Sequence, residues 1–158
     1  MVDINRKQAE NMLNSFCAAL DDAGCKYQAD REALSIRISF KGDDFDLAYN
    51  IRFDEERQII RFRSDMPFGV KPTEKADVAL AVCHANYLLS VGNFDYNYMT
   101  GDITFRMTES FRSSLISKTA CLFMLSLALD IVEKFNDKFF LVATDQMSVE
   151  QFCAAVKG

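Results

Sequence analysis

A long apolar segment near the C-terminus constrains the fold of this chain most. Residues 120–132 contain only two polar side chains, Ser126 and Asp130. At 100° per residue both lie in one narrow polar stripe, so most of the circumference of such a helix is apolar. The run is shorter than the roughly 20 residues that a membrane-spanning helix needs. We therefore expect a core helix that packs on two sides. One side packs on a sheet, and the other packs on an N-terminal helix, on the C-terminal segment or on another copy of the chain.

Two regions alternate between apolar and polar residues with a period of two, which is the pattern of half-buried strands. The first spans residues 34–63 and contains three such runs, separated by a turn at 41–43 and by the acidic segment 54–57. The second, residues 94–108, reads as a hairpin that reverses at Thr100-Gly101-Asp102. We expect antiparallel strands with one face on the core and the other in water.

Helical periodicity predicts an amphipathic helix over residues 3–23, with Asp3 as its N-cap and Gly24 as its stop. A second helix is expected from Thr73 to about Val91, ended by Gly92.

The long apolar helix is expected to start near Ser113 and to reach Asp137 or beyond. A short terminal helix follows, because Ser148 and Gln151 fit a capping box. The predicted fold is therefore α+β, in the order α-β-β-β-α-β-β-α, with an antiparallel sheet and helices packed on one face. No linker interrupts the 158 residues, so residues 1–158 are expected to form a single domain.

Charge and the N-terminal sequence narrow the classes of partner. A net charge of -5 argues against a general binder of nucleic acid, whose affinity rests on clustered Lys and Arg. The start, MVDINRKQAENML, has no apolar region behind a basic one, so we expect neither a signal peptide nor a membrane anchor and place the protein in the cytoplasm.

The sequence offers little for metal or covalent chemistry. Five cysteines are widely spaced without a C-x-x-C pair, which predicts reduced thiols. His84 is the single histidine, so a Cys/His metal site lacks ligands, and its helical neighbour Cys83 points about 100° away. The usual phosphate, nucleophile-elbow and zinc motifs are missing. The acidic groups at 43–46 and 54–56 are interpreted as solvated turns, so we expect no catalytic residue, metal or cofactor.

One set of charged residues is a candidate binding site. Strand alternation aims five arginines away from the core: Arg37, Arg52, Arg61, Arg63 and Arg106. Side by side on one sheet face, they would receive an anionic or acidic partner through forked hydrogen bonds. The alternative is that Asp46, Asp95 and nearby Asn and Thr side chains pair with them across strands.

Several features of residues 77–152 together suggest a known family: Asn86 with Leu88-Leu89, Gly92-x-Phe94, the Gly101-Asp102 hairpin, the apolar helix, and Asp137-x-Phe139-Phe140 before Ser148-x-Glu150. With these features the segment resembles the YbjN family of proposed bacterial sensory transduction regulators, and the element order resembles the type III secretion chaperone-like fold. A proline expected after the aromatic pair is replaced by Leu141-Val142.

The resemblance implies a non-enzymatic, often dimeric module that binds protein segments or acts in regulation. We therefore expect a protein partner and a homodimer. The alternatives are a small-ligand sensory domain with a pocket between sheet and helices, and an unrecognised enzyme. A closed apolar pocket with converging polar groups would favour the sensory domain, whereas a flat or grooved surface with unpaired apolar residues would favour protein binding.

Overall fold

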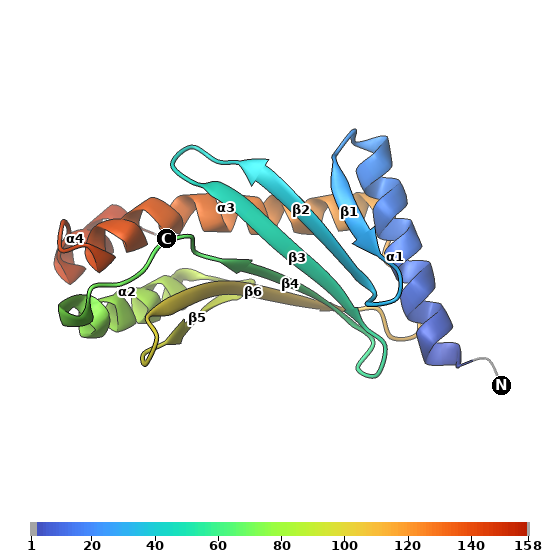
Figure 1. Cartoon of the computed structure of the whole chain (residues 1–158), viewed down its shortest axis with the longest axis horizontal. Helices are drawn as coiled ribbons and strands as arrows, with labels where there is room; N and C mark the ends of the chain where they lie inside the picture. Colours follow the sequence, from blue (N-terminus) through green and yellow to red (C-terminus); the bar gives the residue numbers. More distant parts are fainter. Residues whose placement is uncertain (1–2, 158) are drawn as a thin grey trace.

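The structure is a computed structural model that describes residues 3–157. Its elements follow the order α1 (Ile4–Asp22), β1 (Tyr27–Asp30), β2 (Ser35–Lys41), β3 (Asp46–Asp54), β4 (Ile59–Asp65), the 3-10 turn η1 (Pro72–Glu74), α2 (Lys75–Leu88), β5 (Asn93–Asn97), β6 (Asp102–Ser110), α3 (Lys118–Ala143) and α4 (Val149–Ala155). Figure 1 shows the sheet in front, with the long α3 running behind it and α1 at one end.

The strands form one six-stranded sheet in the order β1-β2-β3-β4-β6-β5, and every neighbouring pair is antiparallel. An apolar row crosses its inner face, where Ile36 lies opposite Ile51, Ile51 opposite Phe62, and Phe62 opposite Met107. All four side chains are buried. The alternation predicted from the sequence is therefore confirmed, and the α+β fold with it.

Helices of the same chain provide most of the second cover of α3. Both α1 and α2 pack on α3, and α4 contacts its C-terminal half. A cluster of rings joins these layers, with Phe139 stacked on Phe152 at 5.3 Å and Phe94 edge-on to Phe139 at 4.9 Å between ring centroids. Among the described residues of α3, Phe123 is the large apolar side chain that stays exposed, at 66%.

The predicted helix ends are confirmed at several caps. The carboxylate of Asp3 accepts hydrogen bonds from the backbone N–H groups of Asn5 and Arg6, and Gly24 follows α1 with φ +69°. Ser148 and Gln151 form the reciprocal capping box of α4. These caps satisfy donors that a helix end leaves unpaired.

One strand and two helix boundaries differ from the sequence prediction. The strand β1 was not predicted, because only Tyr27 of its four residues is partly buried and no alternation marks it. Helix α2 ends at Leu88 rather than near Val91, since Leu89 already has extended backbone with ψ 130°. Helix α3 begins at Lys118 rather than near Ser113, because Ser117 is its N-cap and residues 111–117 serve as the connection from β6.

Candidate functional site

The outer face of the sheet carries all five predicted arginines in two adjacent cross-strand rows. In one row Arg37 lies opposite Asn50, which lies opposite Arg63, and Arg63 lies opposite Arg106. In the next row Arg52 lies opposite Arg61. The strands β2, β3, β4 and β6 thus bring these side chains together on the face that the helices leave open (Figure 1). We call this surface, defined by those five residues, the arginine face.

Two of the cross-strand pairs on this face join like charges. Arg52 opposes Arg61, and Arg63 opposes Arg106. Like charges directly opposite each other in a sheet are destabilising. Their cost must be offset inside the chain by carboxylates or outside it by a partner.

Aspartates neutralise three of the five arginines. Arg106 pairs with Asp95 at 2.9 Å and Arg63 with Asp65 at 3.2 Å. These pairs are solvent-exposed, so each is worth at most about 1 kcal/mol.

Asp54 pairs with Arg61 at 3.4 Å and also with Arg57 at 3.2 Å. Burial by itself raises the pKa of Asp54, but the backbone N–H and guanidinium of Arg57 and the charge of Arg61 outweigh it and hold that pKa below its usual value. Asp54 is therefore charged at neutral pH and balances this end of the arginine face.

Arg37 and Arg52 form no ion pair with any residue in the described part of the chain. Both side chains are exposed, on strands that are fixed by pairing on both sides. Of the carboxylates predicted as partners, Asp95 pairs as expected, whereas Asp46 lies opposite Lys41 at the far end of β3. The structure therefore leaves two guanidinium groups available to an external acceptor.

Two shallow hollows meet at Arg63. One, of about 370 Å³, lies over β4, β6 and β5 and includes Arg61 and Arg106. The other, of about 580 Å³, lies over β1 to β4 and includes Arg37 and Asn50. Both are open and lined mainly by polar groups, which suits a protein segment lying across the sheet better than an enclosed small ligand.

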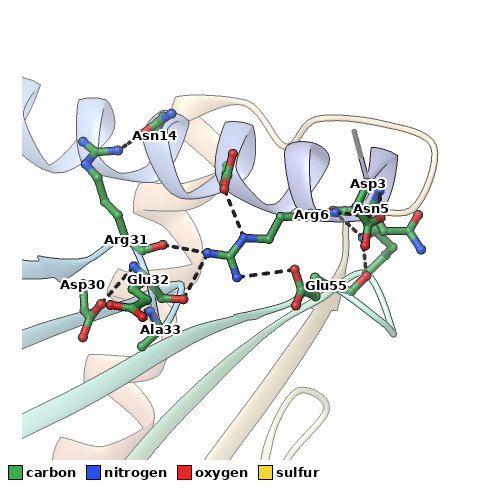
Figure 2. A network of polar contacts seen from close by, with 11 residues as sticks. Asp3, Asn5, Arg6, Asn14, Asp30, Arg31, Glu32, Ala33 and Glu55 are labelled. Atoms are coloured by element: carbon green, nitrogen blue, oxygen red, sulfur yellow. Dashed lines mark hydrogen bonds and ion pairs between the residues drawn. The ribbon is translucent and has the colours of Figure 1, made fainter. Parts of the chain in front are cut away.

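A polar network around Arg6 ties helix α1 to one end of the sheet (Figure 2). The guanidinium of Arg6 donates to the carbonyl oxygens of Arg31 and Glu32, each at 3.1 Å, and pairs with Glu10 at 3.0 Å and Glu55 at 3.5 Å. Helix α1 is thereby tied to the β1–β2 turn and to the β3–β4 turn.

The β1–β2 turn is also held by hydrogen bonds of its own residues. The carboxylate of Asp30 accepts from the N–H groups of Glu32 and Ala33 at 3.0 and 2.9 Å, and Arg31 also donates to Asn14. Arg6 and Arg52 line the same hollow of about 340 Å³. The network therefore borders the arginine face at Arg52.

The histidine, cysteine and acidic side chains considered for metal binding or catalysis do not gather into a site in residues 3–157. His84 is half-buried, with its ring 6.5 Å from that of Phe152 and 6.3 Å from that of Tyr87. Residues 3–157 contain no group of three or more His, Cys, Asp or Glu side chains that is arranged to hold a metal ion. Within that range, none of the helices combines the length and the apolar character that crossing a membrane requires.

Sequence reasoning missed one surface feature, an apolar groove between β6 and α3. Phe123 forms part of it and lies on the exposed side of α3 between Thr119 and Ser126. The sequence did contain a signal for this groove, because a large aromatic residue stands among the polar residues on the exposed side of the helix.

The chain has an α+β fold of the type III secretion chaperone-like kind. The structure of the HopA1–SchA chaperone–effector complex contains a chain that matches with a TM-score of 0.58 and 10% identity, over 87% of this chain and 99% of that one. The crystal structure of YbjN from E. coli, described as "a putative transcription regulator", matches with a TM-score of 0.58 and 12% identity, over 84% of this chain and 91% of that one. At these identities the likeness shows the fold.

The chain belongs to the YbjN family, described as "Putative bacterial sensory transduction regulator", whose family model matches residues 12–141. Among curated proteins, no sequence matches the chain. The predicted family and fold are therefore both confirmed.

Proposed function

We propose that this chain is a non-enzymatic protein-binding module, chaperone-like or regulatory, whose arginine face receives an acidic segment of a partner protein. The observation that carries the proposal is that Arg37 and Arg52 form no ion pair in the described chain and lie on a sheet face that no helix of residues 3–157 covers. Arg52 also lies opposite Arg61, and a carboxylate-bearing partner bound by forked hydrogen bonds would offset the cost of that like-charge pair. The family and the similarity to a chain in a chaperone–effector complex support the same kind of role.

The shape of the surface favours a protein partner over a small sensory ligand. The hollows at the arginine face are open and polar, and the apolar groove beside β6 is also open. None of these three is a closed apolar pocket with converging polar groups. We accordingly propose that residues 1–158 act as one binding domain in the reducing cytoplasm.

We also propose that the module is a homodimer joined through the exposed side of α2. Leu80 and Tyr87 are 57% and 83% exposed there, and the exposed Cys83 lies between them. A two-fold pair would bury the same stripe from each copy. Light scattering of the wild-type chain should give about twice 18.0 kDa, and the double variant Leu80→Asp/Tyr87→Ser should give the single mass. A wild-type mass near 18.0 kDa across a dilution series would overturn the dimer.

Charge reversal on the arginine face tests the proposed function. Arg37→Glu/Arg52→Glu removes the two arginines that have no ion pair in the described chain, so no internal pair is broken. Lys7→Glu/Lys157→Glu makes the same change in net charge at exposed positions away from this face. Circular dichroism checks that all three proteins are folded.

Affinity capture from the native host, read by quantitative mass spectrometry, then compares the three proteins. We expect at least one protein to be retained by the wild type and the lysine variant and depleted about tenfold by the arginine variant, a difference of roughly 1.4 kcal/mol in binding. Equal retention by all three baits would contradict a role for the arginine face.

A further inference from the structure

The edge of β6 is only half covered. Strand β5 pairs with residues 102–106 of β6, whereas β6 continues to Ser110 and pairs there with β4 alone. Figure 1 shows the short β5 beside one end of β6 and the rest of β6 extending past it. Residues 107–110 therefore present a sheet edge without a strand beside it.

The hydrogen bonds at both ends of β6 show which backbone groups point to this edge. The carbonyl of Ile103 accepts from Met66 at 2.9 Å, and the N–H of Phe111 donates to Gln58 at 2.9 Å, so both residues face the β4 side. Backbone directions alternate along an antiparallel strand, and the register shows no bulge between them. The N–H and C=O of Thr108 consequently point to the open edge, where no residue of the described chain pairs with them.

Side chains close two of the backbone sites next to this edge. The amide of Asn86 pairs with both edge-facing groups of Phe94 in β5, accepting from its N–H at 2.8 Å and donating to its C=O at 2.9 Å. The carboxylate of Glu109 accepts from the N–H of Ser110 at 3.3 Å. Beside these closed sites, the N–H and C=O of Thr108 stay open to another strand.

An apolar groove of about 330 Å³ runs along the open edge. Its walls are Met107 on β6 and Ala120, Phe123 and Met124 on α3, and Val91 lies in the loop before β5. Phe123 and Val91 are 66% and 45% exposed. Apolar side chains of an added strand would enter here.

The other side of the same edge carries two arginines, Arg61 and Arg106, which pair with Asp54 and Asp95. Thr108 lies opposite Arg61 on the outer face, and Arg106 is two residues away on the same strand and face. The residue of an added strand opposite Thr108 would point its side chain to this outer face, while its two neighbours would point into the groove. The open edge thus joins the arginine face to the apolar groove.

We propose that residues 107–110 of β6 accept an extended segment of a partner protein as an added strand, and that this segment alternates acidic and apolar residues. Its apolar side chains fill the groove at Phe123, its acidic ones meet Arg61 and Arg106, and its backbone pairs with Thr108. The inference rests on the proposed protein-binding function and gives the chemistry of the partner. A second copy fits less well, because pairing two β6 edges would set Arg61 and Arg106 of both copies side by side and add no carboxylate from a partner.

The probe is a short synthetic peptide that alternates valine and glutamate, labelled for fluorescence anisotropy, with valine–lysine and serine–glutamate peptides as controls. Thr108→Pro removes the N–H that faces the open edge and leaves the ladder to β4 intact. Phe123→Asp places a charge in the groove at an exposed position. Ile4→Asp is the matched control, since Ile4 is a 78% exposed apolar residue on another helix.

We expect the valine–glutamate peptide to bind the wild type and the Ile4 variant equally, with at least about tenfold weaker binding to the Thr108 and Phe123 variants. The backbone amide resonance of Thr108 should shift on titration. Absence of binding, equal binding to all variants, or equal binding of the control peptides would overturn the inference. So would a dimer that Thr108→Pro or Phe123→Asp converts to a monomer, because the edge would then be occupied by a second copy.

The two proposals fail in distinguishable ways. If partners captured from the host are lost with Arg37→Glu/Arg52→Glu but retained with Phe123→Asp, the arginine face binds protein and the strand-addition site is refuted. If the peptide binds as predicted but the wild type and Arg37→Glu/Arg52→Glu retain the same host proteins in equal amounts, the open edge is a binding site. The proposed role of these two arginines is then refuted.

Discussion

Replacing Asn86 should destabilise the protein far more than its partly exposed position on α2 suggests. Its side-chain amide forms two hydrogen bonds with the edge-facing backbone of Phe94, at 2.8 and 2.9 Å. Phe94 is 2% exposed, so its backbone groups have poor access to water if Asn86 is removed. Each bond contributes about 1 kcal/mol net. Asn86→Ala should therefore lower the free energy of unfolding by about 2 kcal/mol, or the melting temperature by roughly 4–8 °C for a chain of this size.

Asn86→Asp separates hydrogen bonding from side-chain size. The carboxylate still accepts from the Phe94 N–H but faces the Phe94 carbonyl without a donor, so the loss should equal or exceed that of the alanine variant. Protonation restores a donor, so the deficit of Asn86→Asp relative to wild type should shrink as the pH falls below about 4. A conservative substitution should thus be as damaging as a truncation at neutral pH.

Urea unfolding followed by circular dichroism measures these differences. Asn11→Ala on the exposed side of α1 is the control. It makes the same change in helix propensity, but the side chain of Asn11 forms no hydrogen bond in the described chain. The reasoning is refuted if Asn86→Ala lies within about 0.5 kcal/mol of Asn11→Ala, which is the usual range of surface substitutions.

Three further predictions concern the core, a turn and the thiols. Phe139→Ala should cost about 3–5 kcal/mol in urea unfolding, because the ring is fully buried among other rings; a loss below about 1 kcal/mol would contradict the packing. Gly42→Ala should cost about 1–3 kcal/mol by the same measurement, because an added Cβ would collide with Glu133 and with backbone; an unchanged midpoint would show that the turn adapts. Burial raises the pKa of the Cys121 thiol to about 11, so alkylation at pH 8 should modify the exposed Cys83 long before Cys121, and mass spectrometry showing the reverse order would disprove the placement.

The alternation of residues 34–63 was enough to predict the sheet and the direction of the arginines. A period of two assigns every second side chain to one face, so Arg37 and Arg52 share the outer face whatever the strand order. The ion-pair partners of the arginines could be identified only once the register of the paired strands was known. Asp65 lies beside Arg63 because the two are two residues apart on one strand, a signal that the sequence did contain.

The open edge of β6 could not be predicted in the same way. It exists because β5 begins only at Asn93, opposite Arg106, while β6 continues for four residues beyond Arg106, and such a difference appears only once strands are paired. The strand β1 was missed because an edge strand with polar residues has no alternation to reveal it. Both gaps in the prediction fall at sheet edges, where the hydrophobic pattern is weakest.

The most direct test of the account is hydrogen–deuterium exchange of the chain, alone and with a partner recovered by capture. We predict slowed exchange in peptides that cover β2 and the segment from Thr104 to Arg112, with no change in α4. The Thr108 amide, which has no pairing group in the described chain, should show the largest slowing when the partner binds. Slowing confined to α2 and α4, with β2 and β6 unchanged, would contradict the claim that this protein binds its partner through the open face and edge of its sheet.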